Sequence, residues 1–171
     1  MQKTFASGCT GDKCVSECGK NWEENGEHCY YWSTNSRTWK AAERFCQKKG
    51  GHLASISSDV IRRYVLKGMG LNNYHKIWLG GTDKEEEGAW SWSDCTPFDY
   101  TSWGNKQPSN GGGHEDCMEM IGGSYKGKWN DISCRVKRDF LCSQRKCIGR
   151  LYRTNSLIKQ PKSFKYASCQ R

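Results

Sequence analysis

The chain has 171 residues, 35% of them apolar and 12% aromatic, and a formal net charge of +9. This length suits one domain with some residues to spare, and no apolar run approaches the roughly 18 residues of a membrane-spanning helix. Eleven cysteines in a chain this short are typical of an oxidising compartment, where disulfides reinforce a small core. We therefore expect a secreted, extracellular protein, although its first residues, MQKTFASG, lack the apolar stretch of a signal peptide.

The positive charge is concentrated toward the C-terminus. Residues 143–171 contain eight basic side chains and no acidic one, whereas residues 1–142 contain 19 basic and 18 acidic ones. We expect this basic segment either to dock on anionic glycans, acidic lipids or microbial surfaces, or to be a solvated extension. It shows no base-reading motif, so nucleic acid is not an expected partner.

Two segments have the apolar spacing of amphipathic helices. The segment 38–51 begins with Thr38 as a candidate N-cap and ends at Gly50 or Gly51, and the segment 57–70 has Ser58 as its candidate cap. Their predicted inner faces consist of Trp39, Ala42, Phe45 and Cys46 in the first helix and of Ile61, Tyr64 and Val65 in the second.

The second half of the chain is typical of short strands. Apolar runs separated by Gly, Pro, Asn and Asp occur at 77–81, 89–92, 117–121, 128–132 and 139–143. Two helices followed by short strands indicate the α+β class. The stretch 94–114 has little strand pattern, and loops of that length in a domain are usually functional or disordered.

Several short motifs recur in a recognisable order. They are WLGG at 78–81, GAW at 88–90, QPS at 107–109, EDC at 115–117, WND at 129–131 and FLC at 140–142. Together they resemble the C-type lectin-like domain over roughly residues 18–143. The resemblance implies two helices, two small antiparallel sheets and a long irregular loop region, stabilised by disulfides. Residues 1–17 would then be an N-terminal cysteine-containing arm and residues 144–171 a basic C-terminal extension.

The resemblance also implies specific disulfides. Cys46–Cys142 and Cys117–Cys134 would be the bridges common to the family, and Cys18–Cys29 the hairpin bridge of its long form. The five cysteines left over allow two local pairs, Cys9–Cys14 and Cys147–Cys169, with Cys95 unpaired. An unpaired cysteine could form a covalent homo- or heterodimer.

The QPS and WND motifs carry the side-chain oxygens that a hard cation prefers. Calcium binds six to eight oxygens from carboxylates, amides and water, and a bridge between Cys117 and Cys134 would bring the two segments together. The resemblance implies that a sugar-binding Ca²⁺ lies between them, with a cis peptide before Pro108. The implied metal ligands are Gln107, Ser109, Glu115, Asn130 and Asp131, and the first four of these would also contact the sugar.

Ser109 departs from the family pattern, in which Asn or Asp usually follows the proline. A hydroxyl lacks the charge of a carboxylate, so we expect weaker calcium binding. Gln107 resembles the Gln-Pro-Asp members, which tend toward galactose, whereas Glu-Pro-Asn members tend toward mannose. No aromatic residue follows the motif to stack on a sugar, and Trp103 before it suits core packing, so the sugar stays undecided.

A second calcium site is implied by an acidic pair, Asp83 and Glu87. In the family such a pair holds an auxiliary ion, which Asn110, Glu115 and Asp116 would complete here. The alternative is that the acidic run 85–87 is only a charged turn.

No pairing of nucleophile and base indicates catalysis, because the four histidines are scattered and no catalytic elbow or zinc-protease motif occurs. The sequence therefore predicts a non-enzymatic, calcium-dependent carbohydrate-binding lectin with a role in defence or agglutination. The alternative is a lectin-like domain that binds protein, ice, mineral or anionic surfaces without reading sugar through calcium.

Overall fold

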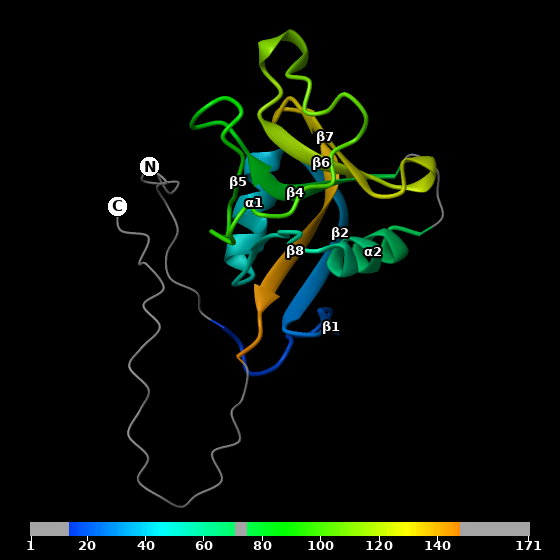
Figure 1. Cartoon of the computed structure of the whole chain (residues 1–171). Coiled ribbons are helices and arrows are strands. Elements are labelled where there is room, and N and C mark those ends of the chain that lie inside the picture. The colour runs from blue at the N-terminus through cyan, green and yellow to red at the C-terminus, as the bar shows by residue number, and fades with distance from the viewer. Residues whose placement is uncertain (1–13, 71–74, 148–171) are drawn as a thin grey trace, which may run out of the picture.

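The computed structural model describes residues 14–70 and 75–147 (Figure 1). Two helices and a twisted sheet occupy this part of the chain, and long loops cover one end of the sheet. The elements are β1 (Glu23–Asn25), β2 (His28–Arg37), α1 (Trp39–Lys48), β3 (His52–Leu53), α2 (Asp59–Gly68), β4 (Lys76–Thr82), β5 (Ser91–Trp92), the 3₁₀ turn η1 (Gly111–Gly113), β6 (Cys117–Ile121), the 3₁₀ turn η2 (Gly123–Tyr125), β7 (Lys128–Ile132) and β8 (Arg138–Arg145).

Both predicted helices are confirmed. Thr38 occupies the N-cap position of α1 without a side-chain hydrogen bond, whereas the Ser58 hydroxyl accepts a hydrogen bond from the backbone N–H of Ile61 and caps α2. α1 buries Ala42 and Cys46, which lie four residues apart on one face.

The strands form one mixed sheet in the order β1-β2-β8-β4-β6-β7, with β3 paired to β8 and β5 to β4. The α+β class is confirmed, and the strands expected in two small sheets are linked because β4 and β8 pair in parallel. Strand β2 was not predicted from the sequence; it pairs with β8 from His28↔Arg145 to Arg37↔Arg138. That pairing joins opposite ends of the domain, so no local pattern reports it.

Side chains along the central strands alternate between two buried clusters. In β8, Phe140 and Cys142 face the cluster under α1, while Leu141 faces the cluster under α2. In β4, Trp78 faces α1 and its neighbour Ile77 faces the other side. This period of two places a hydrophobic layer on each face of the sheet, with one helix over each layer.

The predicted family disulfides are confirmed, but the three predictions for the other cysteines are wrong. Cys46–Cys142, Cys117–Cys134 and Cys18–Cys29 are all formed. Cys14 pairs with Cys147 rather than with Cys9, so the predicted Cys147–Cys169 bridge is excluded as well. Cys95 is disulfide-bonded and not unpaired. Cys9 and Cys169 themselves lie outside the described residues.

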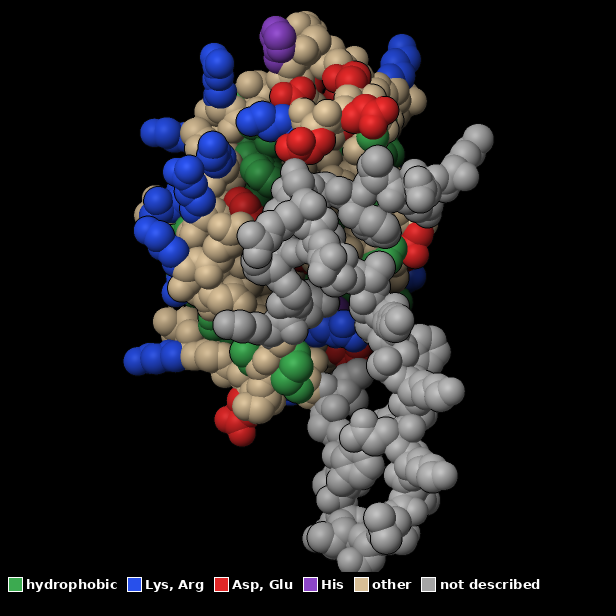
Figure 2. All heavy atoms as spheres, turned by 90° about the vertical axis from the view of Figure 1, so that its left-hand side faces the viewer, with side chains coloured by type: hydrophobic (Ala, Val, Ile, Leu, Met, Phe, Trp, Pro, Cys, Tyr) green, Lys and Arg blue, Asp and Glu red, His purple; other side chains and the backbone are tan. Residues whose placement is uncertain are grey.

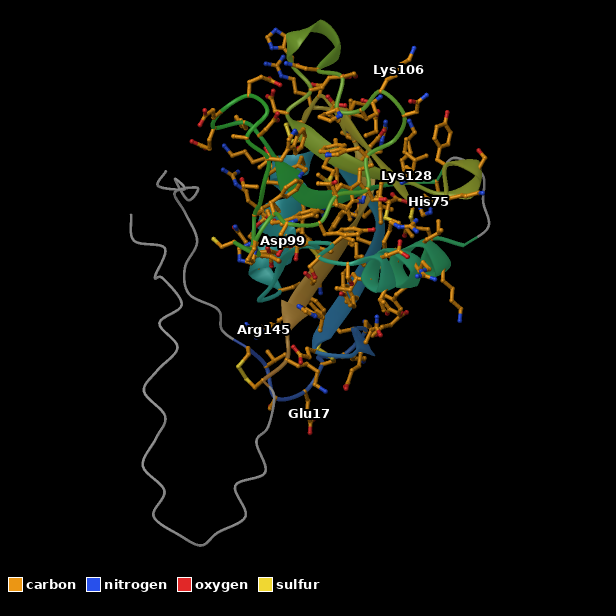
Figure 3. All side chains as sticks on the ribbon, viewed as in Figure 1. Glu17, His75, Asp99, Lys106, Lys128 and Arg145 are labelled. Carbon is orange, nitrogen blue, oxygen red and sulfur yellow. A yellow bond between two sulfur atoms is a disulfide. The ribbon has the colours of Figure 1, made fainter. Side chains whose placement is uncertain are left out.

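The Cys14–Cys147 bridge has a topological cause. The backbone of Val15 donates to Arg145 and accepts from Cys147, at 2.9 and 2.8 Å, so the two ends of the described chain run side by side. Figure 3 shows Glu17 and Arg145 together at the lower end of the domain, away from the loop that carries Lys106. The predicted domain boundaries stay predictions, and residues 1–13 and 148–171 lie outside the described residues.

Candidate functional site

The long loop is attached to the strand that carries the WND motif. Trp103 and Trp129 form an isolated parallel bridge, and the Gly104 N–H donates to the carbonyl of Trp129 at 2.8 Å. Their indole rings pack edge to face with centroids 5.7 Å apart, which confirms the core role predicted for Trp103. The Gln107–Pro108 peptide is cis, as predicted. The QPS segment is therefore held next to β7 by both backbone and aromatic contacts.

Asp131 ties the QPS segment to β7 directly. Its side chain is buried, with 1% of its surface exposed. The Ser109 N–H donates to both carboxylate oxygens, at 2.9 and 2.8 Å, and the Asn110 N–H donates to one of them at 2.6 Å. Charge-assisted bonds of this kind are the stronger class of protein hydrogen bond. The two predicted halves of the site therefore meet at this carboxylate.

Glu115 closes the loop on itself. Its carboxylate accepts from the Ser109 hydroxyl at 3.1 Å and from the Gly111 N–H at 2.5 Å, and its own N–H donates to the Asn110 side-chain oxygen at 3.3 Å. A Cβ at position 111 would lie 2.8 Å from that carboxylate, so a larger residue there would displace the Glu115 side chain from this position. Hydrogen bonds thus connect four of the predicted ligand positions, which are Ser109, Asn110, Glu115 and Asp131.

Gln107 and Asn130 lie beside this group with different surroundings. The Gln107 side-chain oxygen is buried and has no hydrogen-bond partner. A buried polar atom without a partner costs about 1–3 kcal/mol, so its cause needs an explanation. The Asn130 amide nitrogen donates to Glu119 at 3.1 Å, which leaves the Asn130 oxygen as the acceptor for another group.

Glu119 is a site-supporting residue that the sequence analysis missed. It is completely buried and accepts from Arg138 Nε at 2.6 Å, while Lys76 Nζ lies 3.3 Å from its other oxygen. With Asn130, these contacts join four adjacent strands, β4, β6, β7 and β8, around one carboxylate. A single acidic residue in the apolar run CMEMI was the available signal, because a charge inside a buried strand needs partners.

A second acidic group lies at the end of β4. Asp83 is 4% exposed; one of its oxygens accepts from the Gly88 N–H at 3.0 Å, and the other is buried without a partner. Burial raises the pKa of Asp83, and the nearby carboxylates of Asp116 and Asp131 raise it further. Desolvation, followed by the charge of Asp83, also raises the pKa of the exposed Glu87. The acidic side chains predicted for the auxiliary site therefore do repel one another in the fold.

Amide and hydroxyl oxygens make up much of the predicted ligand sets. Within residues 14–70 and 75–147, no three His, Cys, Asp or Glu side chains are placed to hold a metal ion by themselves. A cation at this loop would have to take ligands from Gln107, Ser109 and Asn130 as well. Such mixed oxygen ligands suit calcium rather than zinc.

The comparisons with known proteins agree with this fold. The Lectin C-type domain model matches residues 35–144. The chain is similar to the galactose-specific lectin nattectin of Thalassophryne nattereri, with 37% identity over 137 residues that cover 77% of this chain and 83% of that lectin.

Two solved structures show how widely the fold is used. The carbohydrate-recognition domain of the mouse scavenger receptor C-type lectin aligns with a TM-score of 0.69 and 34% identity, covering 76% of this chain and 99% of that one. A calcium-independent type II antifreeze protein aligns equally well, with a TM-score of 0.69 and 32% identity, covering 75% of this chain and 95% of that one.

The chain therefore belongs to the C-type lectin domain family, a carbohydrate-binding family without enzymatic activity. Within the described residues, no helix has both the length and the apolar character needed to cross a bilayer.

Proposed function

We propose that the protein is a secreted lectin that binds carbohydrate through a calcium ion held between the QPS and WND segments, in defence or agglutination. The observation that carries the proposal is the buried, unpartnered oxygen of Gln107. It lies in a loop that is already bonded to the carboxylates of Asp131 and Glu115. A cation would supply the missing partner for this oxygen and would balance the two negative charges.

The residues present suit calcium. Gln107, Ser109 and Asn130 offer neutral oxygens, and Glu115 and Asp131 offer charged ones, which matches the oxygen preference of this ion. The bound ion would supply open coordination positions for two neighbouring sugar hydroxyls. The chain would supply hydrogen-bond partners for the same hydroxyls, and Glu119 would hold the Asn130 amide so that its oxygen remains free for this task.

The favoured ligand is a galactose-type sugar. Gln107 supports this choice, as does the 37% identity to a lectin described as galactose-specific. The loop after Pro108 carries glycines rather than an aromatic residue, so the sugar would depend on hydrogen bonds and metal contacts without ring stacking. We therefore expect weak monosaccharide binding and a larger contribution from multivalent display.

An auxiliary ion at Asp83 and Glu87, completed by Asn110, Glu115 and Asp116, belongs to the same proposal. The second Asp83 oxygen is buried without a partner, which parallels Gln107. Repulsion between Asp83 and its acidic neighbours would be relieved by a cation. Two ions per chain are therefore expected at high calcium concentration.

The test is calcium titration by calorimetry together with retention on galactose-agarose in calcium and in EDTA. Wild type should bind calcium and be released by EDTA. Gln107→Ala should weaken calcium binding and abolish retention, because it removes the oxygen that has no other partner. Asn35→Ala is the matched control, since it also removes a neutral amide side chain, but from an exposed position of β2 outside the proposed site. Absence of calcium binding at millimolar concentration would refute the proposal.

One observation favours a calcium-free alternative. The Asp131 and Glu115 carboxylates are already satisfied by backbone N–H groups and by the Ser109 hydroxyl, so the loop closes without an ion. A calcium-independent antifreeze protein has the same fold at 32% identity. If galactose is not bound, recognition of protein, ice or mineral by this face becomes the preferred function, and EDTA should leave it unchanged.

A further inference from the structure

The outer face of α1 carries an uninterrupted row of positive charge. Lys40, Arg44 and Lys48 are exposed and spaced four residues apart, so they lie along one side of the helix at intervals of about 6 Å. The only acidic residue of α1 is Glu43, which is buried. Its carboxylate is directed inward, where the Leu53 N–H donates to it at 2.8 Å. The outward side of the helix therefore has no negative side chain of its own.

The loop between β7 and β8 extends this positive surface. The Trp39 N–H at the start of α1 donates to the carbonyl of Cys134 at 3.1 Å, and Val136 packs in the hydrophobic cluster beneath α1. The exposed Arg135 and Lys137 flank Val136 and so lie beside the helix. We call the combined surface the α1 basic face; it consists of Lys40, Arg44, Lys48, Lys49, Arg135 and Lys137.

The cations of this face are not neutralised by acidic side chains within the described part of the chain. Among the residues that the structure describes, none of the six side chains forms an ion pair. Figure 2 shows Lys and Arg side chains gathered along the left edge of the molecule and acidic side chains gathered at the upper right. Because residues 1–142 are nearly neutral, this separation gives the domain a positive side and an acidic loop end.

One cation of the face, Lys49, is oriented by aromatic rings. Lys49 Nζ lies 4.4 Å from the ring centre of Tyr31 and 5.3 Å from that of Phe45. The guanidinium of Arg37, which is not part of the face, lies 5.1 Å from the same Phe45 ring centre. Cation–π contacts orient the charges without neutralising them. A ligand therefore meets one cation of the face, Lys49, that has already lost part of its conformational entropy, which favours binding.

We propose that the α1 basic face binds a linear anionic polysaccharide, with sulfate or carboxylate groups along its length, independently of calcium. A row of cations along a helix matches a chain of repeating anions better than it matches a single small anion. A lipid surface is disfavoured because the large exposed apolar side chains of the described residues are Val60 and Tyr125, neither of which belongs to this face. None of the six cations belongs to the proposed calcium site.

The experiment measures heparin affinity of the full chain in EDTA, so that failure of the calcium proposal cannot affect it. The variant Lys40→Gln/Arg44→Gln/Lys48→Gln should elute from heparin at lower salt and lose affinity by about 10- to 100-fold. The control Lys67→Gln/Lys126→Gln/Lys128→Gln removes the same charge from exposed positions elsewhere and should elute close to wild type. Both variants keep all basic residues that lie outside the described residues, so these cannot cause a difference in elution between the two variants.

A second variant excludes a helix-folding artefact. Arg135→Gln/Lys137→Gln alters no helical residue and should also weaken heparin binding, with an unchanged melting temperature. Equal elution of the helix variant and its control would overturn the proposal, because affinity would then follow net charge alone. Binding to phosphatidylserine vesicles without binding to heparin would overturn it as well.

Discussion

Substitution of Glu119 by Gln tests the buried network that supports the site. The carboxylate is completely buried, and its partners Arg138 and Lys76 are 21% and 34% exposed. Removing one member of a buried ion pair costs about 3–5 kcal/mol, because the remaining charge stays desolvated. Partial exposure of both cations lowers that cost, and glutamine keeps one acceptor for Asn130. We expect a loss of about 2–3 kcal/mol in the free energy of unfolding.

This loss corresponds to a fall in melting temperature of about 4–12 °C for a chain of this size. Thermal unfolding followed by circular dichroism measures it directly. Glu24→Gln is the matched control: Glu24 pairs with Lys146 but is 56% exposed, so its loss should cost less than about 1 kcal/mol. The same Glu119 variant should bind calcium more weakly, because the Asn130 amide loses a charged partner.

Two results would refute this reasoning. An unchanged melting temperature would mean that Arg138 and Lys76 are hydrated well enough to need no buried carboxylate. An altered melting temperature with unaltered calcium affinity would mean that Glu119 supports the sheet but does not position Asn130.

Three further predictions concern separate parts of the domain. Ser109→Asp places a second carboxylate beside Glu115, so it should lower the melting temperature in EDTA and tighten calcium binding by about 10-fold, as measured by calorimetry. Burial lowers the pKa of His28 below its usual 6.5. As pH falls, His28 is protonated in the unfolded chain before it is protonated in the folded chain, so the free energy of unfolding should fall as pH drops below 6.5. His28→Gln should therefore reduce the change in melting temperature between pH 7 and pH 5. Replacing Cys14 and Cys147 together by Ser should lower the free energy of unfolding by about 3 kcal/mol, as measured by denaturant unfolding. The two cysteines are 133 residues apart in the sequence, but the other disulfides shorten the loop that this bridge closes in the unfolded chain. An unchanged denaturant midpoint would contradict this prediction.

Local patterns in the sequence were sufficient for the two helices and five of the strands, and the family resemblance was sufficient for three of the disulfides. The helices follow from apolar spacing and from the caps at Thr38 and Ser58, which depend on neighbours within one or two turns. The five strands follow from short apolar runs between turn residues. The bridges came from the family resemblance, which includes information about distant pairing that composition alone lacks.

Only the tertiary structure decided which distant groups meet. The backbone bridge between Val15 and Lys146 brings Cys14 to Cys147, although a local partner for each was the simpler expectation. The tertiary structure also shows that Glu119 and Asn130 share a hydrogen bond and that the buried side-chain oxygen of Gln107 has no hydrogen-bond partner. These contacts are set by strand register and burial, which depend on the whole sheet. The residue types that could bind a cation were visible in the sequence, because the oxygen atoms of a side chain are fixed by the residue type alone.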